Sequence, residues 1–142
     1  MRYSEIDLQI EDLMWFAIDR AGYIGAFTSG GCANVPEFIC RSREDNERLY
    51  DYIMDELDDF ASGKLIGIKQ RSEQGEDCSL LISKGITCFD VFKHGDDYGK
   101  IAESFEPITI DQLDDEIKDI LQDHKIDADF LNDDIIKVEH AY

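Results

Sequence analysis

The chain has 142 residues, of which 33 are acidic and 14 are basic, and its formal net charge is -19. A negative field of this size repels phosphate backbones and anionic lipid surfaces, so we expect no direct nucleic-acid binding and no membrane binding. Hydrophobic residues make up 43% of the chain, which is typical of a protein with a packed core, and the length predicts a single globular domain spanning residues 1–142.

The four cysteines, Cys32, Cys40, Cys78 and Cys88, show no Cys-x-x-Cys spacing and have no histidine pair beside them. This pattern predicts no zinc or other metal site, and no cofactor motif is present. Cys88 lies in an apolar run and is expected to be buried, whereas Cys32 and Cys78 lie in turn-like sequence and are expected to be exposed. Without a signal peptide or an apolar run of about 18 residues, the chain is expected to stay in the reducing cytoplasm.

In chain order, the first predicted elements are strands. Residues 1–13 alternate apolar side chains at Ile6, Leu8 and Ile10, which fits a short strand or an ordered lead-in to the first strand. Residues 14–36 hold two apolar runs, MWFAI and YIGAF, around a turn at residues 19–22. This arrangement predicts a β-hairpin whose aromatic side chains enter the core, followed by a glycine-rich bend with the sequence TSGG.

The clearest predicted helix runs from Arg43 to Ala61. Ser42 precedes it as an N-cap, with Asp45 at the capping-box position, and Gly63 follows it as a stop signal. Apolar side chains recur at helical spacing along one side and predict a face that packs on the core. These side chains are Leu49, Ile53, Leu57 and Phe60.

The opposite side of the same helix is acidic. Like charges four residues apart weaken a helix, so local stability does not explain this arrangement. A ridge of carboxylates complements lysines and arginines, such as those that line the groove of a nuclease, and we predict that this face binds a basic protein partner. The alternative is a solubilising surface. The candidate partner-binding residues are Glu44, Glu47, Asp51, Asp55, Asp58 and Asp59.

The remainder of the chain predicts a sheet followed by a second helix. Residues 64–106 favour three or four strands, mainly antiparallel, with turns at SEQGED and KHGDDYG. Thr109 and Gln112 form a capping box that predicts a helix over 111–123, and residues 126–138 fit either a short helix or a closing strand. The predicted fold is α+β, a mostly antiparallel sheet with an N-terminal hairpin and two or three helices packed on it.

No motif in the sequence predicts catalysis. The TSGGC segment lacks the lysine and the helix start of a phosphate-binding loop, and His94 lies in a segment typical of a hairpin turn. His124 and His140 stand alone in acidic sequence and are expected to be solvated. The acidic cluster at residues 127–134 lacks the glycine and glutamate of an EF-hand, and no nucleophile motif is present. We therefore predict that the chain is not an enzyme.

Two segments resemble uncharacterised bacterial proteins of the kind found as immunity proteins of polymorphic toxin systems. They are WFAIDRAGYIGAFTSGG at Trp15–Gly31 and PITIDQLDDEIKDIL at Pro107–Leu121, and together they cover under a quarter of the chain. Asp114 stands where we would expect a proline in the second motif. A looser likeness to the SMI1/KNR4 superfamily, whose bacterial members also include immunity proteins, points the same way. The resemblance implies a small cytoplasmic α+β inhibitor that binds a cognate toxin.

Charge and resemblance together predict an acidic stoichiometric binding protein. The expected function is that of an immunity protein, which inhibits a basic toxin such as a nuclease by covering its active groove with acidic side chains. An alternative from another class is a regulatory or scaffold domain that binds proteins but has no toxin partner. An unrecognised small-molecule enzyme is the third possibility.

Overall fold

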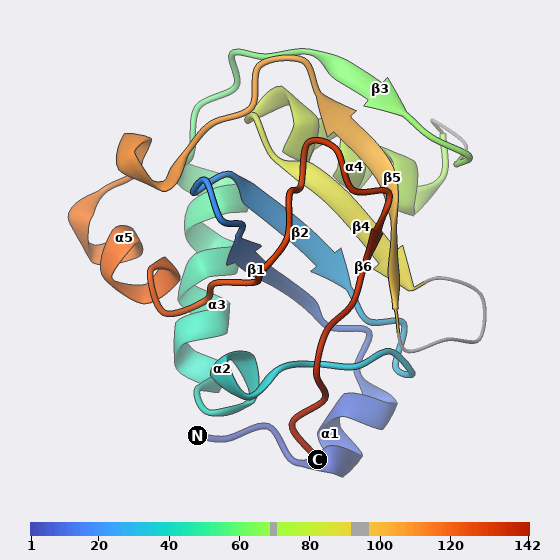
Figure 1. The fold of residues 1–142 in the computed structure, drawn as a ribbon, viewed down its shortest axis with the longest axis vertical. Helices are drawn as coiled ribbons and strands as arrows, with labels where there is room; N and C mark the ends of the chain where they lie inside the picture. The colour runs from blue at the N-terminus through green and yellow to red at the C-terminus, as the bar shows by residue number, and fades with distance from the viewer. Residues whose placement is uncertain (69–70, 92–96) are drawn as a thin grey trace.

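The computed structural model describes residues 1–68, 71–91 and 97–142 of an α+β protein (Figure 1). In these residues, one mixed sheet has the strand order β1-β2-β4-β5-β3, and β6 also pairs with β5. The strands are β1 (Met14–Ile18), β2 (Ile24–Thr28), β3 (Gly63–Leu65), β4 (Thr87–Val91), β5 (Tyr98–Ser104) and β6 (Ile135–Ile136). The helices are α1 (Glu5–Ile10), α2 (Glu37–Cys40), α3 (Arg43–Asp51), α4 (Glu73–Ser83) and α5 (Asp115–Leu121), with a π-helical turn at Tyr52–Glu56 and a 3-10 turn at Ile110–Gln112.

The predicted N-terminal hairpin is confirmed by the antiparallel pairing of β1 with β2. Its turn depends on Asp19, whose Oδ1 accepts hydrogen bonds from the backbone N–H groups of Ala21 at 3.0 Å and Tyr23 at 2.9 Å. Gly22 supplies the positive φ of 87° that the turn needs. The prediction of a mostly antiparallel sheet is also confirmed, since β2 with β4 is the one parallel pair among the described strands.

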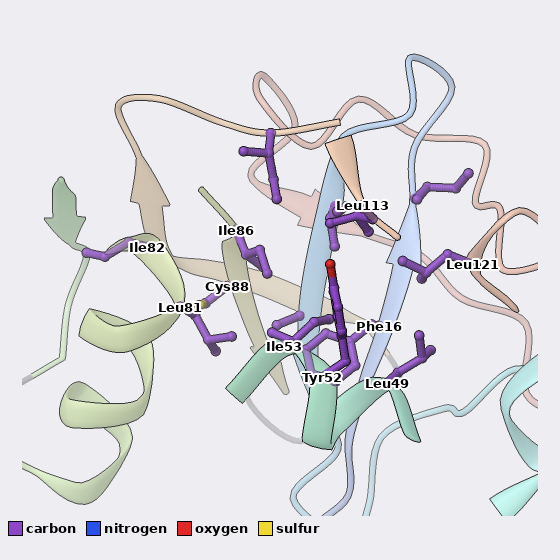
Figure 2. Close-up of a cluster of buried hydrophobic side chains, with 14 of the residues drawn as sticks. Phe16, Leu49, Tyr52, Ile53, Leu81, Ile82, Ile86, Cys88, Leu113 and Leu121 are labelled. Atoms are coloured by element: carbon purple, nitrogen blue, oxygen red, sulfur yellow. The ribbon is translucent and has the colours of Figure 1, made fainter. Parts of the chain in front are cut away.

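One face of the sheet packs against α3, α4 and α5. Figure 2 shows Leu49 and Ile53 of the α3 region and Leu81 of α4 directed toward the strands, where Phe16 and Cys88 lie. These side chains belong to one buried cluster that extends to α5. Burying a side chain of this size stabilises the fold by roughly 1.5–3 kcal/mol. The apolar stripe predicted for the first long helix therefore packs on the core at Leu49 and Ile53.

The other face of the sheet carries an aromatic layer that is covered by the C-terminal segment. Trp15, Phe27 and Phe89 are fully buried there, together with Phe130 from that segment. In Figure 1 the C-terminal segment, drawn in red, crosses the front of the sheet and brings the two chain ends to the same side of the molecule. A hydrogen bond links this segment to the hairpin, since Asp19 Oδ2 accepts from the backbone N–H of Phe130 at 2.9 Å.

Helix α3 begins where the sequence predicts but ends earlier. The Ser42 hydroxyl accepts a hydrogen bond from the backbone N–H of Asp45 at 3.1 Å, which confirms the N-cap. The prediction of one helix to Ala61 is wrong, because a π-helical turn follows Asp51 and regular structure ends at Glu56. The backbone N–H groups of residues 60 and 61 donate to the Ser83 carbonyl instead, and Phe60 is 52% exposed. Carboxylates at residues 55, 58 and 59 repel one another and disfavour continuation of the helix.

Residues 73–83 form a helix, which corrects the turn and strand predicted there. The Ser72 hydroxyl accepts a hydrogen bond from the backbone N–H of Gly75 at 2.9 Å and caps α4. Cys78, Leu81 and Ile82 are buried against the sheet. An apolar run of this length fits either a buried strand or a helix, and contact with the sheet selects the helix. Gly85, with a φ of 84°, then lets the chain turn into β4.

Two further segments differ from the sequence predictions, and a third fits one of the two predicted alternatives. Residues 5–10 form a helix instead of a strand, because Ser4 and Asp7 make a capping box. The predicted Thr109 cap is present, with the Thr109 N–H donating to Gln112 Oε1 at 3.0 Å, but it begins only a 3-10 turn that precedes a separate α5. At the C-terminus, β6 corresponds to the closing-strand alternative. No helix in the described part of the chain is long and apolar enough to cross a membrane.

The histidines predicted to be solvated are packed against the fold. His124 is 1% exposed, its ring stacks on Phe38 with centroids 5.0 Å apart, and its Nδ1 lies 3.3 Å from the Phe16 carbonyl oxygen. His140 is half-buried and accepts a hydrogen bond from the backbone N–H of Val35 at 3.0 Å. Burial lowers the pKa of His124 to about 4. The prediction was wrong because the residues next to His124 in the sequence are polar and give no sign that this segment contacts β1. At that contact, the Ile18 N–H donates to the His124 carbonyl oxygen.

The buried neutral His124 should make the protein less stable in mild acid. Its pKa is about 4 in the folded state and about 6.5 when unfolded, so the unfolded state takes up a proton first as the pH falls. Stability should therefore decrease from about pH 6.5 to about pH 4, by about 3 kcal/mol in total. Urea unfolding of His124→Gln should lack this part of the pH dependence, whereas His140→Gln should retain it. Identical pH profiles in both variants would contradict the assignment.

Candidate functional site

A cleft of about 690 Å³ opens between α3 and α4. Strand residues form its floor, namely Met14 of β1, Ala26 and Thr28 of β2, and Cys88 of β4. Three of these four side chains are short, and larger ones would fill the space in a close-packed protein. The composition of the strands on the helix-covered face is therefore one physical reason for the cleft.

The two helical walls of the cleft carry carboxylates. Glu47 and Asp51 lie on α3, and Glu73 and Asp77 lie on α4. In residues 1–68, 71–91 and 97–142, no lysine or arginine forms an ion pair with any of these four side chains. Carboxylates that face one another without a countercharge attract cations.

A third side of the cleft already holds its own cation, Arg43. The guanidinium lies 4.2 Å from the centroid of the Tyr3 ring. Its Nη1 donates to Glu11 Oε1 at 3.0 Å, and its Nη2 lies 3.3 Å from Asp7 Oδ2. The charge of Arg43 is thus neutralised by carboxylates from α1 and its C-cap, and the walls formed by α3 and α4 stay anionic.

Two side chains of the cleft, Asp77 and Tyr50, have pKa values raised by burial and by neighbouring negative charges. Burial, and then the negative charges of Glu73 and Glu76, raise the pKa of Asp77. Burial, and then the charges of Asp77, Asp55 and Asp51, raise the pKa of Tyr50, which also lines the cleft. Both shifts have the sign that burial and uncompensated negative charge produce.

Asn46 is a buried polar residue of the cleft that the sequence did not indicate. It lies on α3, is 3% exposed, and donates from Nδ2 to the Met14 carbonyl at 3.1 Å and to the Tyr3 hydroxyl at 3.3 Å. Its Oδ1 has no hydrogen-bond partner, unlike every other buried side-chain polar atom in the part of the chain that the structure describes. The available sequence signal was position, since Asn46 falls on the same helical stripe as Leu49 and Ile53.

The six acidic residues predicted to bind a partner do not form one ridge. Because α3 changes to a π-helical turn and then ends, only Glu47 and Asp51 line the cleft. Asp55 and Asp58 are exposed outside it. The two remaining predicted residues are held in ion pairs, Glu44 with the N-terminal amine and Asp59 with Lys84. The sequence did not indicate the α4 carboxylates of the cleft, because it predicts a turn and a strand for residues 73–83 and not a helix.

Three of the four cysteines are buried, and the glycine bend is bound by a carboxylate of the same chain. Cys32 is exposed and Cys88 is buried, as predicted, but the prediction of an exposed Cys78 is wrong because α4 turns it inward. At the bend, the Gly30 N–H donates to Asp12 Oδ1 at 2.9 Å, so a carboxylate takes the position that a phosphate would need. Within the described ranges, no group of three or more histidine, cysteine or acidic side chains is arranged to hold a metal ion. His94 lies outside the described residues.

Comparison of the chain with protein-family models, with curated proteins and with solved structures gives no match.

Replacing one cleft carboxylate should stabilise the free protein. The raised pKa of Asp77 means that its ionised form is disfavoured in the folded state, so Asp77→Asn should raise the free energy of unfolding at about pH 7 by about 0.5 kcal/mol. The gain should disappear as the pH falls below about 4, because wild-type Asp77 is then protonated. Urea unfolding of both proteins at the two pH values measures the difference. A loss of stability at neutral pH would show that Asp77 makes a favourable interaction.

Proposed function

We propose that the protein is an acidic stoichiometric binding protein, an immunity protein that inhibits a basic toxin such as a nuclease. The observation that supports this proposal is the cleft between α3 and α4, whose wall carboxylates have no cation partner among the described residues. Asp77 is half-buried there, and a carboxylate kept only for solubility has no need of such a position, because solvated carboxylates on an open surface serve that purpose at less cost.

The overall charge supports binding of a basic protein. A net charge of -19 creates a long-range field that accelerates encounter with a cationic surface. Nucleases present lysines and arginines to nucleic acid, so the groove of such a toxin is complementary in sign to the cleft. The exposed Asp55 and Asp58 extend the negative surface beyond the cleft and would act mainly on the association rate.

The toxin is expected to be the product of an adjacent gene. When expressed alone it should stop growth, and co-expression with this chain should restore growth and give a complex on gel filtration. Stopped-flow mixing of the two purified proteins should show an association rate that falls about tenfold or more between about 0.05 M and 0.5 M NaCl. Absence of both rescue and complex for every adjacent product would contradict the immunity function, and a host partner encoded elsewhere would favour a regulatory or scaffold domain.

Matched charge variants test the place of binding. The cleft variant combines Glu47→Gln, Asp51→Asn and Asp77→Asn, and the control removes three charges elsewhere on the surface with Asp111→Asn, Asp119→Asn and Glu139→Gln. Because both variants change the net charge equally, a difference between them reports on the cleft. The cleft variant should weaken the complex by about tenfold or more, and the control should not. Equal weakening by the two variants would show that net charge, and not the cleft, determines binding.

A further inference from the structure

Two cysteines meet where α4 rests on the sheet. Cys78 lies on α4 and Cys88 lies on β4, and both side chains are buried in the helix-covered cluster. Both also line the cleft between α3 and α4. A hydrogen bond joins the two thiols, so their sulfur atoms face one another across the contact between helix and strand.

The strands below α4 leave room around this pair. The register places Ala26 of β2 and Ala102 of β5 on the two sides of Cys88, and all three side chains belong to the helix-covered cluster. A disulfide requires β-carbons about 3.5–4.5 Å apart and a defined torsion about the sulfur–sulfur bond. Because the neighbouring side chains are short, the two thiols can rotate toward this geometry without displacing a large group.

The chain between the two cysteines is short and already turns back on itself. Helix α4 ends at Ser83, Gly85 has a φ of 84°, and β4 begins at Thr87. The Ile86 N–H donates to the Leu81 carbonyl at 3.1 Å and fixes the turn. This connection already holds the two cysteines on facing elements, so closing a bond between them costs little additional loop entropy.

The surroundings of the pair indicate which thiol reacts first. Burial, then the contact with Cys78, and then the negative charge of Asp77 raise the pKa of Cys88 well above its ordinary value. Cys88 is therefore protonated at neutral pH, whereas the thiolate is the form that attacks an oxidant. Oxidation is expected to begin at Cys78.

We propose that Cys78 and Cys88 are a redox-sensitive pair that closes to a disulfide when the protein meets hydrogen peroxide. In the first step the Cys78 sulfur takes one oxygen atom from peroxide, which gives a sulfenic acid and one water. In the second step the Cys88 sulfur attacks the Cys78 sulfur, the sulfur–oxygen bond breaks, and the hydroxyl leaves as water with the Cys88 proton. Two thiols are oxidised and one peroxide is reduced to two waters.

The disulfide would join one wall of the cleft to its floor, since α4 carries the wall and β4 contributes to the floor. A thiol reductant reverses the reaction by exchange. This property belongs to the free chain and goes beyond the proposed function, because no partner is needed for the bond to form.

Tryptic mapping of the oxidised wild-type chain tests the bond directly. Trypsin cleaves after Lys84, between the two cysteines, so Cys78 falls in peptide 72–84 and Cys88 in peptide 85–93. The protein is treated with about 1 mM hydrogen peroxide for about one hour, and the remaining thiols are alkylated. The non-reduced digest should contain the two peptides as one cross-linked species, and dithiothreitol should restore both free peptides.

Thermal unfolding provides a second readout. The bond constrains the unfolded chain, so the oxidised protein should melt about 5 °C or more above the reduced protein. Cys78→Ser should lack the cross-link and this increase, whereas the control Cys32→Ser, which replaces the exposed cysteine, should retain both. Because Cys78→Ser places a hydroxyl among buried side chains, mapping of the wild-type chain is the decisive measurement.

Three results of the mapping would overturn the proposal. The first is recovery of both cysteines as alkylated thiols after peroxide treatment. The second is a sulfinic acid at Cys78 without the cross-linked species. The third is a cross-link that joins either cysteine to Cys32 or Cys40 instead.

Discussion

The packing on which the structure depends is the row of aromatic rings across β1, β2 and β4. The strand register places Trp15 opposite Phe27 and Phe27 opposite Phe89, with ring centroids 4.3 and 4.9 Å apart. Tyr98 and Phe130 close the row edge-on, at 5.2 and 5.6 Å from Phe27. Shifting any of these strands by one residue would turn its ring to the opposite face, so the row specifies the register of antiparallel and parallel pairs alike.

The cleft follows from the same alternation of side chains. Large rings occupy the face covered by the C-terminal segment, and the intervening positions on the helix-covered face include the short Ala26 and Cys88. Helices α3 and α4 rest on that face through Leu49 and Leu81, and the space above the short side chains opens between them. A rigid floor with charged walls is an arrangement suited to holding one group of a partner in a defined place.

Packing and charge affect the stability of this protein in opposite directions. The core contains the buried clusters, whereas the wall carboxylates on α3 and α4 have no ion-pair partner in the described residues and the pKa of Asp77 is raised by its surroundings. Ionised Asp77 therefore lowers the stability of the folded protein, and a cation beside it would offset this cost. A basic partner, as proposed, would lower this electrostatic cost.

Local signals in the sequence determined the hairpin with its turn at Asp19, the start of α3 at Ser42 and the acidic character of the surface, since each depends on neighbouring residues or on composition alone. Only the tertiary structure decided that residues 73–83 form a helix, that His124 is buried, and that Asn46 is buried with an unpaired Oδ1. These features depend on contacts between segments far apart in the chain, and no local pattern of side chains specifies such contacts.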